Sequence, residues 1–131
     1  MNILYADDDA DDREIFCEAI KEINPAIKVV LGKDGEETLK ILSVQKELPQ
    51  VIFLDINMPK MDGIECLVKL KSDDRLKGIP VIIYSTTSNE NDQTKIALLG
   101  ASDFILKGNS FESVKESLDK ILASHYGSNY Q

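Results

Sequence analysis

The chain has 131 residues, a length that suits one domain, and its formal net charge at pH 7 is −8. This charge disfavours direct binding to nucleic acid phosphates or to an anionic membrane, and no apolar run approaches the roughly 20 residues of a membrane span. Hydrophobic residues make up 43% of the chain and charged residues 29%, which is typical of a soluble domain with a real core.

The amino terminus and the two cysteines indicate a cytoplasmic protein. The first residues run Met-Asn-Ile-Leu-Tyr and meet acidic residues at once, unlike a secretory signal peptide. Cys17 and Cys66 have neither CxxC nor metal-ligand spacing. Both fall in expected helices, so we interpret them as reduced thiols.

Apolar periodicity predicts five strands that alternate with five helices. Strands are expected at residues 2–6, 27–31, 51–54, 81–84 and 103–106. Helices are expected from residue 9 or 10 to 23, after the capping signal at 32–37, after residue 62, at about 89–99, and from residue 111. The alternation predicts a single α/β domain in which right-handed crossovers place helices on both faces of a parallel sheet.

Apolar spacing also predicts which helix residues face the core. In the second and third helices these are Leu39, Ile41, Leu42, Ile64, Leu67, Val68 and Leu70, with Val44 as an additional candidate. In the last helix the stripe contains Phe111, Val114, Leu118, Ile121 and Leu122.

Residues 51–63 organise the expected site. The apolar run 51–54 is typical of a strand that is buried on both faces, and Asp55 follows it directly. Open α/β sheets place their chemistry at the carboxyl ends of their strands. Pro59 and Gly63 indicate a loop, and Asp62 has the character of a helix N-cap.

Other strand ends carry polar residues that should meet Asp55. Because parallel strands all end at the same edge, these residues form one rim, which contains Asp7, Asp8, Asp55, Asn57, Ser85, Thr86 and Lys107. Three neighbouring carboxylates repel one another, so the rim needs a cation, either Lys107 or a divalent metal. Oxygen ligands suit Mg²⁺, and a carboxylate beside Mg²⁺ and a lysine can attack phosphorus.

Four motifs occur in order along the chain: ILYADDD at residues 3–9, LDINMPKMDG at 54–63, PVIIYST at 80–86 and GASDFILK at 100–107. Together they resemble the receiver domain of bacterial two-component response regulators, the CheY-like family. The resemblance covers residues 3 to about 122. It implies a flavodoxin-like (βα)5 fold with strand order 2-1-3-4-5, a receiver domain at residues 1–125, a polar C-terminal tail at 126–131, and no output domain.

The resemblance implies a role for each rim residue. Asp55 is implied as the phosphoryl acceptor, supplied by a phosphohistidine on a sensor histidine kinase or a phosphotransfer protein. Asp7, Asp8 (the more direct ligand), Asp55 and the backbone carbonyl of Asn57 are implied as ligands of Mg²⁺, for which Mn²⁺ can substitute.

Residues around the acceptor are implied to sense and tune the phosphoryl group. Lys107 would bind a phosphoryl oxygen, and Ser85 and Thr86 form the hydroxyl-bearing part of the switch. Phe104 would reorient when Ser85 moves. The side chains of Asn57 and Thr87 lie where the family tunes dephosphorylation.

One residue departs from the family pattern. The family usually has Pro after the lysine, joined by a cis peptide, whereas Gly108 follows Lys107 here. A non-proline cis bond costs about 2.5–4 kcal/mol, which favours a trans bond and a more mobile loop without deciding it. The placement of Lys107 is left open by this departure, while the nucleophile and metal ligands are unaffected.

Simpler interpretations stand beside several of these roles. Asp7, Asp8, Asp9, Asp11 and Asp12 can all serve the start of the first helix as caps or dipole partners, and this is the preferred interpretation for the last three. Thr87 begins a capping box with Glu90, Phe104 can be a plain strand aromatic, and Asn57 can be a turn former. His125 is interpreted as solvated surface.

The favoured function is a stand-alone phosphorylatable switch rather than an enzyme. It would exist as a monomer or a phosphorylation-dependent dimer, and would read out through the face formed by the helix at 89–99, the strand at 103–106 and the last helix. The alternative is a pseudo-receiver that only binds partner proteins. An aspartate-nucleophile phosphatase usually needs a second acid where this chain has Asn57, and a flavodoxin-like cofactor binder needs a phosphate loop where this chain has Asp7, Asp8 and Asp9.

Overall fold

The computed structural model describes residues 1–86 and 90–127, with residues 90 and 91 described without their side chains. Within these ranges the strands are β1 (Asn2–Ala6), β2 (Lys28–Gly32), β3 (Val51–Leu54), β4 (Val81–Ser85) and β5 (Asp103–Leu106). They form one parallel sheet in the predicted order β2-β1-β3-β4-β5. The helices are α1 (Ala10–Ile23), α2 (Gly35–Val44), α3 (Gly63–Ser72), α4 (Glu90–Leu98) and α5 (Phe111–Tyr126).

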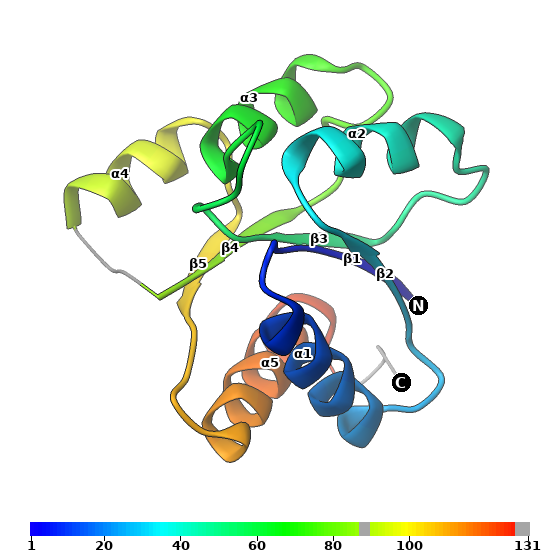
Figure 1. Cartoon of the computed structure of the whole chain (residues 1–131), viewed down its shortest axis with the longest axis vertical. Coiled ribbons are helices and arrows are strands. Elements are labelled where there is room, and N and C mark those ends of the chain that lie inside the picture. The colour runs from blue at the N-terminus through cyan, green and yellow to red at the C-terminus, as the bar shows by residue number, and fades with distance from the viewer. Residues whose placement is uncertain (87–89, 128–131) are drawn as a thin grey trace.

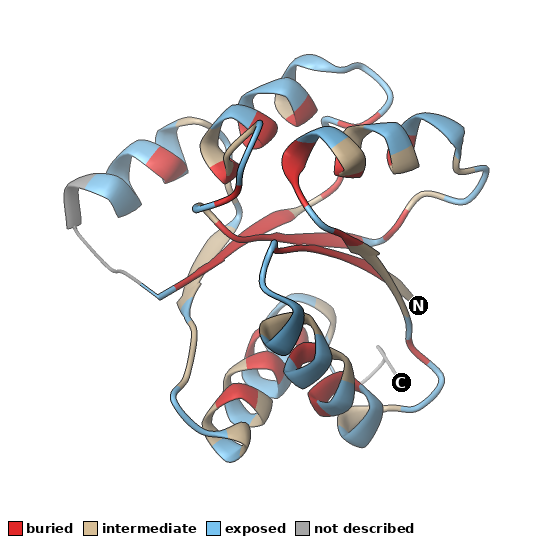
Figure 2. Ribbon diagram, viewed as in Figure 1, coloured by how far each residue is buried: buried red, intermediate tan, exposed pale blue. Residues whose placement is uncertain are grey.

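Helices cover both faces of the sheet (Figure 1). Helices α1 and α5 lie side by side on one face, and α2, α3 and α4 cover the other. The three central strands are buried along their whole length except for Asn2, whereas the edge strands β2 and β5 are partly exposed (Figure 2). Side chains of the central strands alternate between two cores, as the period of two in a strand requires. The predicted doubly wound α/β fold is therefore confirmed.

Polar residues cap four of the helices at the positions where their side chains can reach the first turn. Asp9, Asp34, Asp62 and Ser110 precede α1, α2, α3 and α5, and each accepts a hydrogen bond from a backbone N–H two or three residues later. These bonds satisfy N–H groups that have no partner within the helix. The capping predictions for Asp9 and Asp62 are confirmed, while that for Thr87 falls outside the described residues.

Two core predictions are wrong, and helical geometry explains both. Val44 is 80% exposed and Val68 is 42% exposed. Val44 lies about 200° around α2 from the buried Leu42, so it faces solvent. In α3 the buried face holds Cys66 and Leu70, and Val68 lies on the opposite side.

Strand register places the predicted nucleophile beside the first acidic residue. Ala6 pairs with Leu54, so the next residues, Asp7 and Asp55, leave neighbouring strands at the same level. The N–H of Asp55 donates to the carbonyl of Ala6 at 2.9 Å, which extends the ladder past the end of β3. The sheet itself therefore holds these two carboxylates next to each other.

Helix α3 begins close against the end of β3. The N–H of Gly63 donates to the carbonyl of Ile56 at 2.8 Å. A Cβ atom at residue 63 would lie 2.2 Å from the carbonyl oxygen of Asp55, so only glycine permits this approach. In the described part of the chain, no helix has the length and apolar character needed to cross a membrane.

Candidate functional site

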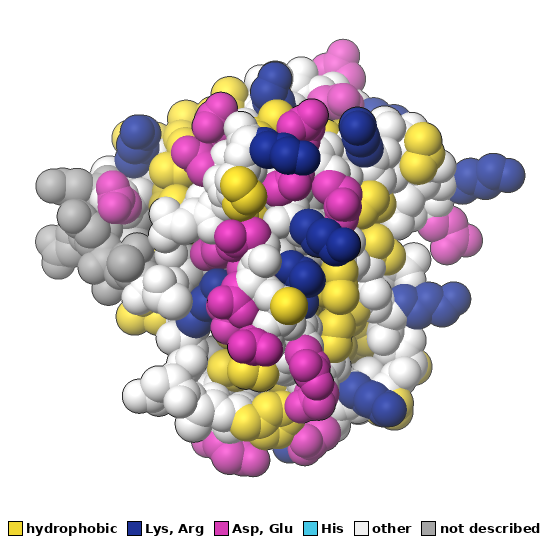
Figure 3. Space-filling model, viewed as in Figure 1, with side chains coloured by type: hydrophobic (Ala, Val, Ile, Leu, Met, Phe, Trp, Pro, Cys, Tyr) yellow, Lys and Arg dark blue, Asp and Glu magenta, His cyan; other side chains and the backbone are white. Residues whose placement is uncertain are grey.

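Polar residues from three strand ends meet at one edge of the sheet. Asp7 and Asp8 follow β1, Asp55 follows β3 and Lys107 follows β5. The loop that joins β1 to α1 crosses the face turned to the viewer in Figure 1. Figure 3 shows Asp and Glu side chains along the middle of this face, with Lys and Arg side chains between them.

Three carboxylates lie close enough to share one metal ion. One oxygen each from Asp7, Asp8 and Asp55 can be chosen so that all lie within 4.8 Å of one another. Ligands held about 2.1 Å from Mg²⁺ lie roughly 3 to 4 Å apart, so small side-chain movements complete this set. Asp7 and Asp55 are buried and Asp8 is exposed, which leaves one side of the cluster open to water ligands. The donors present therefore fit a hard divalent cation such as Mg²⁺ or Mn²⁺.

Lys107 supplies the positive charge in this cluster. Its ammonium nitrogen lies 2.6 Å from Asp7 Oδ2, 2.9 Å from Asp12 Oδ2 and 3.5 Å from Asp55 Oδ1. Burial alone would lower the pKa of Lys107, but its hydrogen bonds to Asp7 and Asp12 raise the pKa overall, so the side chain is cationic at neutral pH. The sequence predicted that Lys107, directly after β5, lies in the acidic rim, and this position is confirmed.

Asp12 was expected to serve only the start of the first helix, and that expectation is incomplete. Its carboxylate forms an ion pair with Lys107 across the space between α1 and the end of β5. The sequence separation of 95 residues explains why no local pattern indicated the contact. The Lys107–Gly108 peptide bond is trans, like the other peptide bonds of the described residues.

Two residues that the sequence did not single out hold Asp7 in place. The hydroxyl of Tyr5 donates a hydrogen bond to Asp7 Oδ2, and Arg13 donates to the backbone carbonyl of Asp7 at 2.8 Å. Burial, together with the negative charge of Asp7, raises the pKa of Tyr5, so its hydroxyl remains a donor. Tyr5 lies two residues before Asp7 on the same strand face, and this spacing was the signal that could have indicated it.

Asp55 combines burial with negative neighbours. Its exposed fraction is 5%, and burial together with the charge of Asp7 raises its pKa to about 6, against the opposing effect of Lys107. In the metal-free protein its ionised form is therefore held at a cost in stability. A cation that binds beside it would lower this cost and favour the carboxylate that can act as a nucleophile.

Replacement of Asp55 by Asn is therefore expected to stabilise the metal-free protein. The pKa of Asp55 in the folded protein, about 6, lies above its ordinary value of 3.8. The free energy of unfolding of the wild type therefore falls as pH rises from 3.8 to about 6, because the buried carboxyl must ionise. Asp55→Asn has no group to ionise at this position and does not lose this stability. We expect a gain of about 1–3 kcal/mol at pH 7.5, with a smaller gain at pH 4.5, in urea unfolding with a chelator. Asp74→Asn is the control because its side chain is 98% exposed, and an equal gain there would contradict this origin.

The remaining predicted residues occupy different surroundings. Ser85 is buried at the end of β4, Thr86 and Asn57 are exposed, and Phe104 is half-buried against the core beneath α4. Thr87 lies outside the described residues. Their roles in switching and dephosphorylation, and the metal contact of the Asn57 carbonyl, remain predictions.

His125 is exposed, as predicted, and it also contacts one acidic residue. Its Nε2 atom lies 3.3 Å from Asp103 Oδ2, and its side chain is 25% exposed. The contact ties the last turn of α5 to the start of β5, at the opposite end of β5 from Lys107. His125 therefore lies away from the acidic site.

Comparisons with known proteins agree with this geometry. The phosphorylated cyanobacterial phytochrome response regulator RcpA has a TM-score of 0.86 and 31% identity, over 93% of this chain and 91% of that one. The Mn²⁺-bound form of response regulator Rcp1 has a TM-score of 0.85 and 26% identity, over 97% and 95% of the two chains.

A curated relative and the family match extend the comparison to sequence. The transcriptional regulatory protein DegU of Brevibacillus brevis is 34% identical over 117 residues, which cover 86% of this chain but only 48% of DegU. The family model described as the response regulator receiver domain matches residues 3–119. The chain belongs to the response regulator receiver domain family of two-component signalling.

Proposed function

We propose that this receiver accepts a phosphoryl group on Asp55 in a Mg²⁺-dependent reaction and thereby changes how it binds a partner protein. The observation that carries the proposal is the convergence of the buried Asp55 with two further carboxylates and with the ammonium of Lys107. This arrangement supplies a nucleophile, a set of metal ligands and a cation within one rim. A pseudo-receiver that only binds partners would not need all three.

The proposed reaction transfers a phosphoryl group between two protein side chains. A carboxylate oxygen of Asp55 forms a bond to phosphorus as the bond between phosphorus and the imidazole nitrogen of the donor histidine breaks. The electron pair of the broken bond stays on that nitrogen. A bound Mg²⁺ would supply positive charge to the transferring oxygens.

The residues of this chain position the reactants. Asp55 is held by the hydrogen bond from its N–H to the carbonyl of Ala6 and by the close approach of Gly63. Lys107 would bind an oxygen of the phosphoryl group, which it can reach from its position 3.5 Å from Asp55 Oδ1. Asp7 and Asp8, with Asp55 and the carbonyl of Asn57, would hold the metal.

The response to the phosphoryl group is proposed to be a shift between two conformations that both exist beforehand. Ser85 and Thr86 would provide a hydroxyl to the phosphoryl oxygens, and Phe104 would follow the movement. The readout surface would be the face formed by α4, β5 and α5, where Leu98 and Leu106 are exposed at 83% and 46%. The donor would be a sensor histidine kinase or a phosphotransfer protein.

Acetyl phosphate provides a direct test of phosphoryl acceptance. Incubation with acetyl phosphate and Mg²⁺ is expected to add the mass of one phosphoryl group to the wild-type protein, and a chelator should prevent the addition. Asp55→Asn should gain none, while Asp74→Asn, altered at an exposed carboxylate, should gain the same mass as wild type. A gain that survives in Asp55→Asn would contradict the assignment, and no gain in wild type would favour the pseudo-receiver.

A further inference from the structure

Lys107 is held by a carboxylate that is not part of the metal cluster. Its ammonium nitrogen lies 2.9 Å from Asp12 Oδ2, whereas the cluster that fits a metal consists of Asp7, Asp8 and Asp55. Asp12 belongs to the first turn of α1, and its side chain is 34% exposed. Lys107 therefore contacts a carboxylate of α1, in addition to Asp7 and Asp55, which follow β1 and β3.

The position of the ammonium is displaced from Asp55 towards the start of α1. Its distances to Asp7 and Asp12 are those of charge-assisted hydrogen bonds, while 3.5 Å to Asp55 is longer than such a bond. To bind a phosphoryl oxygen on Asp55, the ammonium of Lys107 must move closer to Asp55. The ion pair with Asp12 opposes this movement, because it holds the ammonium near the start of α1.

The backbone around Lys107 is fixed, so this competition concerns the side chain. The N–H of Lys107 donates to the carbonyl of Ser85 at 2.7 Å. Gly108 lies so close to the first turn of α5 that a Cβ atom there would be 2.8 Å from Ser113 Cβ. Asp12 and Lys107 also line a hollow of about 210 Å³ beside this loop, which gives the two side chains room to separate.

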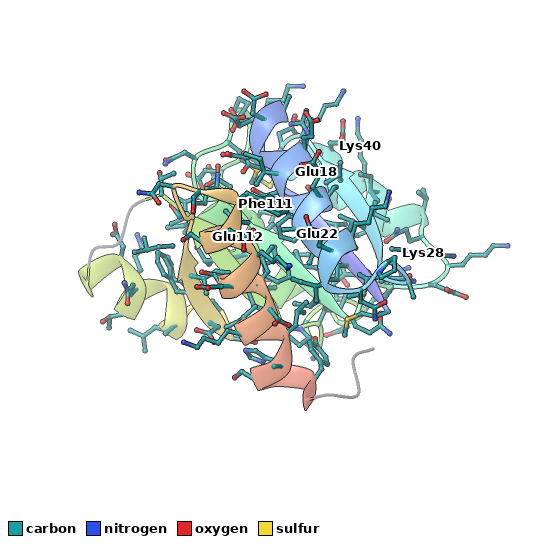
Figure 4. All side chains as sticks on the ribbon, turned by 90° about the horizontal axis from the view of Figure 1, so that it is seen from below. Glu18, Glu22, Lys28, Lys40, Phe111 and Glu112 are labelled. Atoms are coloured by element: carbon teal, nitrogen blue, oxygen red, sulfur yellow. The ribbon has the colours of Figure 1, made fainter. Side chains whose placement is uncertain are left out.

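Helices α1 and α5, which lie side by side on one face of the sheet, begin near this loop. Phe111 and Glu112 lie at the start of α5, and Glu18 and Glu22 lie along α1 (Figure 4). Further along the pair, Lys115 Nζ lies 3.3 Å from Glu22 Oε1. The ion pair between Asp12 and Lys107 thus links α1, which packs against α5, to the acidic site.

We propose that Asp12 is a positioning residue that holds Lys107 in the unphosphorylated arrangement and competes with the phosphoryl group for its ammonium. The inference rests on the proposed function, since it concerns the response of the same site. Loss of Asp12 should remove one of the two short contacts that hold the Lys107 ammonium away from Asp55, leaving the contact with Asp7. The acyl phosphate state should then form more favourably.

Beryllium fluoride, a stable analogue of the phosphoryl group, tests this competition. In the presence of Mg²⁺, we expect Asp12→Asn to bind beryllium fluoride about 3- to 10-fold more tightly than wild type in calorimetric titrations. Asp11→Asn is the matched control, because it removes an exposed carboxylate from the same helix turn, and its affinity should stay within about twofold of wild type. Asp12→Glu should restore an affinity close to that of wild type.

A second measurement without metal shows whether the contact exists in solution. The melting temperatures of Asp12→Asn, Lys107→Met and the double variant are compared in the presence of a chelator, and the drop caused by Lys107→Met should be smaller when Asp12 is already absent. Equal or weaker beryllium fluoride binding by Asp12→Asn, or additive melting shifts, would overturn the role of Asp12. A wild-type protein that binds no beryllium fluoride would instead overturn the proposed function.

Discussion

Replacing Lys107 by Met is expected to lower the free energy of unfolding of the metal-free protein by about 3 kcal/mol. The ammonium contacts three carboxylates, and its side chain is only 8% exposed. Removing one partner from a buried ion pair costs about 3–5 kcal/mol because the opposite charge stays buried without compensation. The partial exposure of Asp12 places the expected loss at the lower end of this range.

Magnesium should restore much of the stability of this variant. With the lysine absent, the metal is the remaining cation that can neutralise Asp7 and Asp55, so it should bind the variant more tightly than wild type. The measurement is urea unfolding with a chelator and again with Mg²⁺, where the metal should stabilise the variant more than wild type.

Lys77→Met provides a matched control for the loss of a lysine charge. Lys77 forms an ion pair with Asp74 at 3.1 Å, but the two side chains are 58% and 98% exposed. Exposed pairs of this kind contribute little, so we expect a change below about 0.5 kcal/mol. A Lys107 variant as stable as this control would show that the acidic cluster does not depend on Lys107.

The second large effect is expected for Gly63→Ala. A Cβ atom at residue 63 would lie 2.2 Å from the carbonyl oxygen of Asp55 and 2.9 Å from Ile56 Cα. Both are backbone atoms, so no side-chain rotation relieves the clash. The start of α3 must move away from the end of β3, at an expected cost of about 3 kcal/mol in the free energy of unfolding.

The same substitution should also weaken any binding of a divalent metal by Asp7, Asp8 and Asp55, because the clash displaces Asp55. Gly78→Ala is the matched control, since a Cβ atom there meets nothing within 4 Å. Its stability should be unchanged or slightly higher, because alanine restricts the unfolded chain. If urea unfolding showed equal stability for both variants, the tight contact between Gly63 and Asp55 would not exist in solution.

The sequence predicted the architecture well because each local signal agreed with the others. The apolar run before Asp55 gave the bounds of β3, and the cap at Asp62 gave the start of α3, and both are confirmed. The wrong core predictions concern helix residues, whose burial depends on the side of the helix on which they lie. Val44 and Val68 are apolar but lie on the outer side of their helices, which composition alone does not reveal.

The acidic cluster was predictable for a similar reason. A parallel sheet brings all carboxyl strand ends to one edge, so the alternation of strands and helices was enough to predict that Asp7, Asp8 and Asp55 meet. The cation from the end of β5 followed from the same rule. These residues needed only the topology, not the details of packing.

The sequence by itself determined the order of the elements, the helix caps and the charged residues of the rim, because these follow from periodicity and from contacts within a few residues. Only the tertiary structure decided which carboxylates Lys107 contacts, that Arg13 donates to the carbonyl of Asp7, and that Gly63 lies against Asp55. These contacts join segments through the register of the sheet and the packing of α1 and α3 against strand ends. Side-chain directions across such distances depend on the whole fold, and no local pattern in the chain records them.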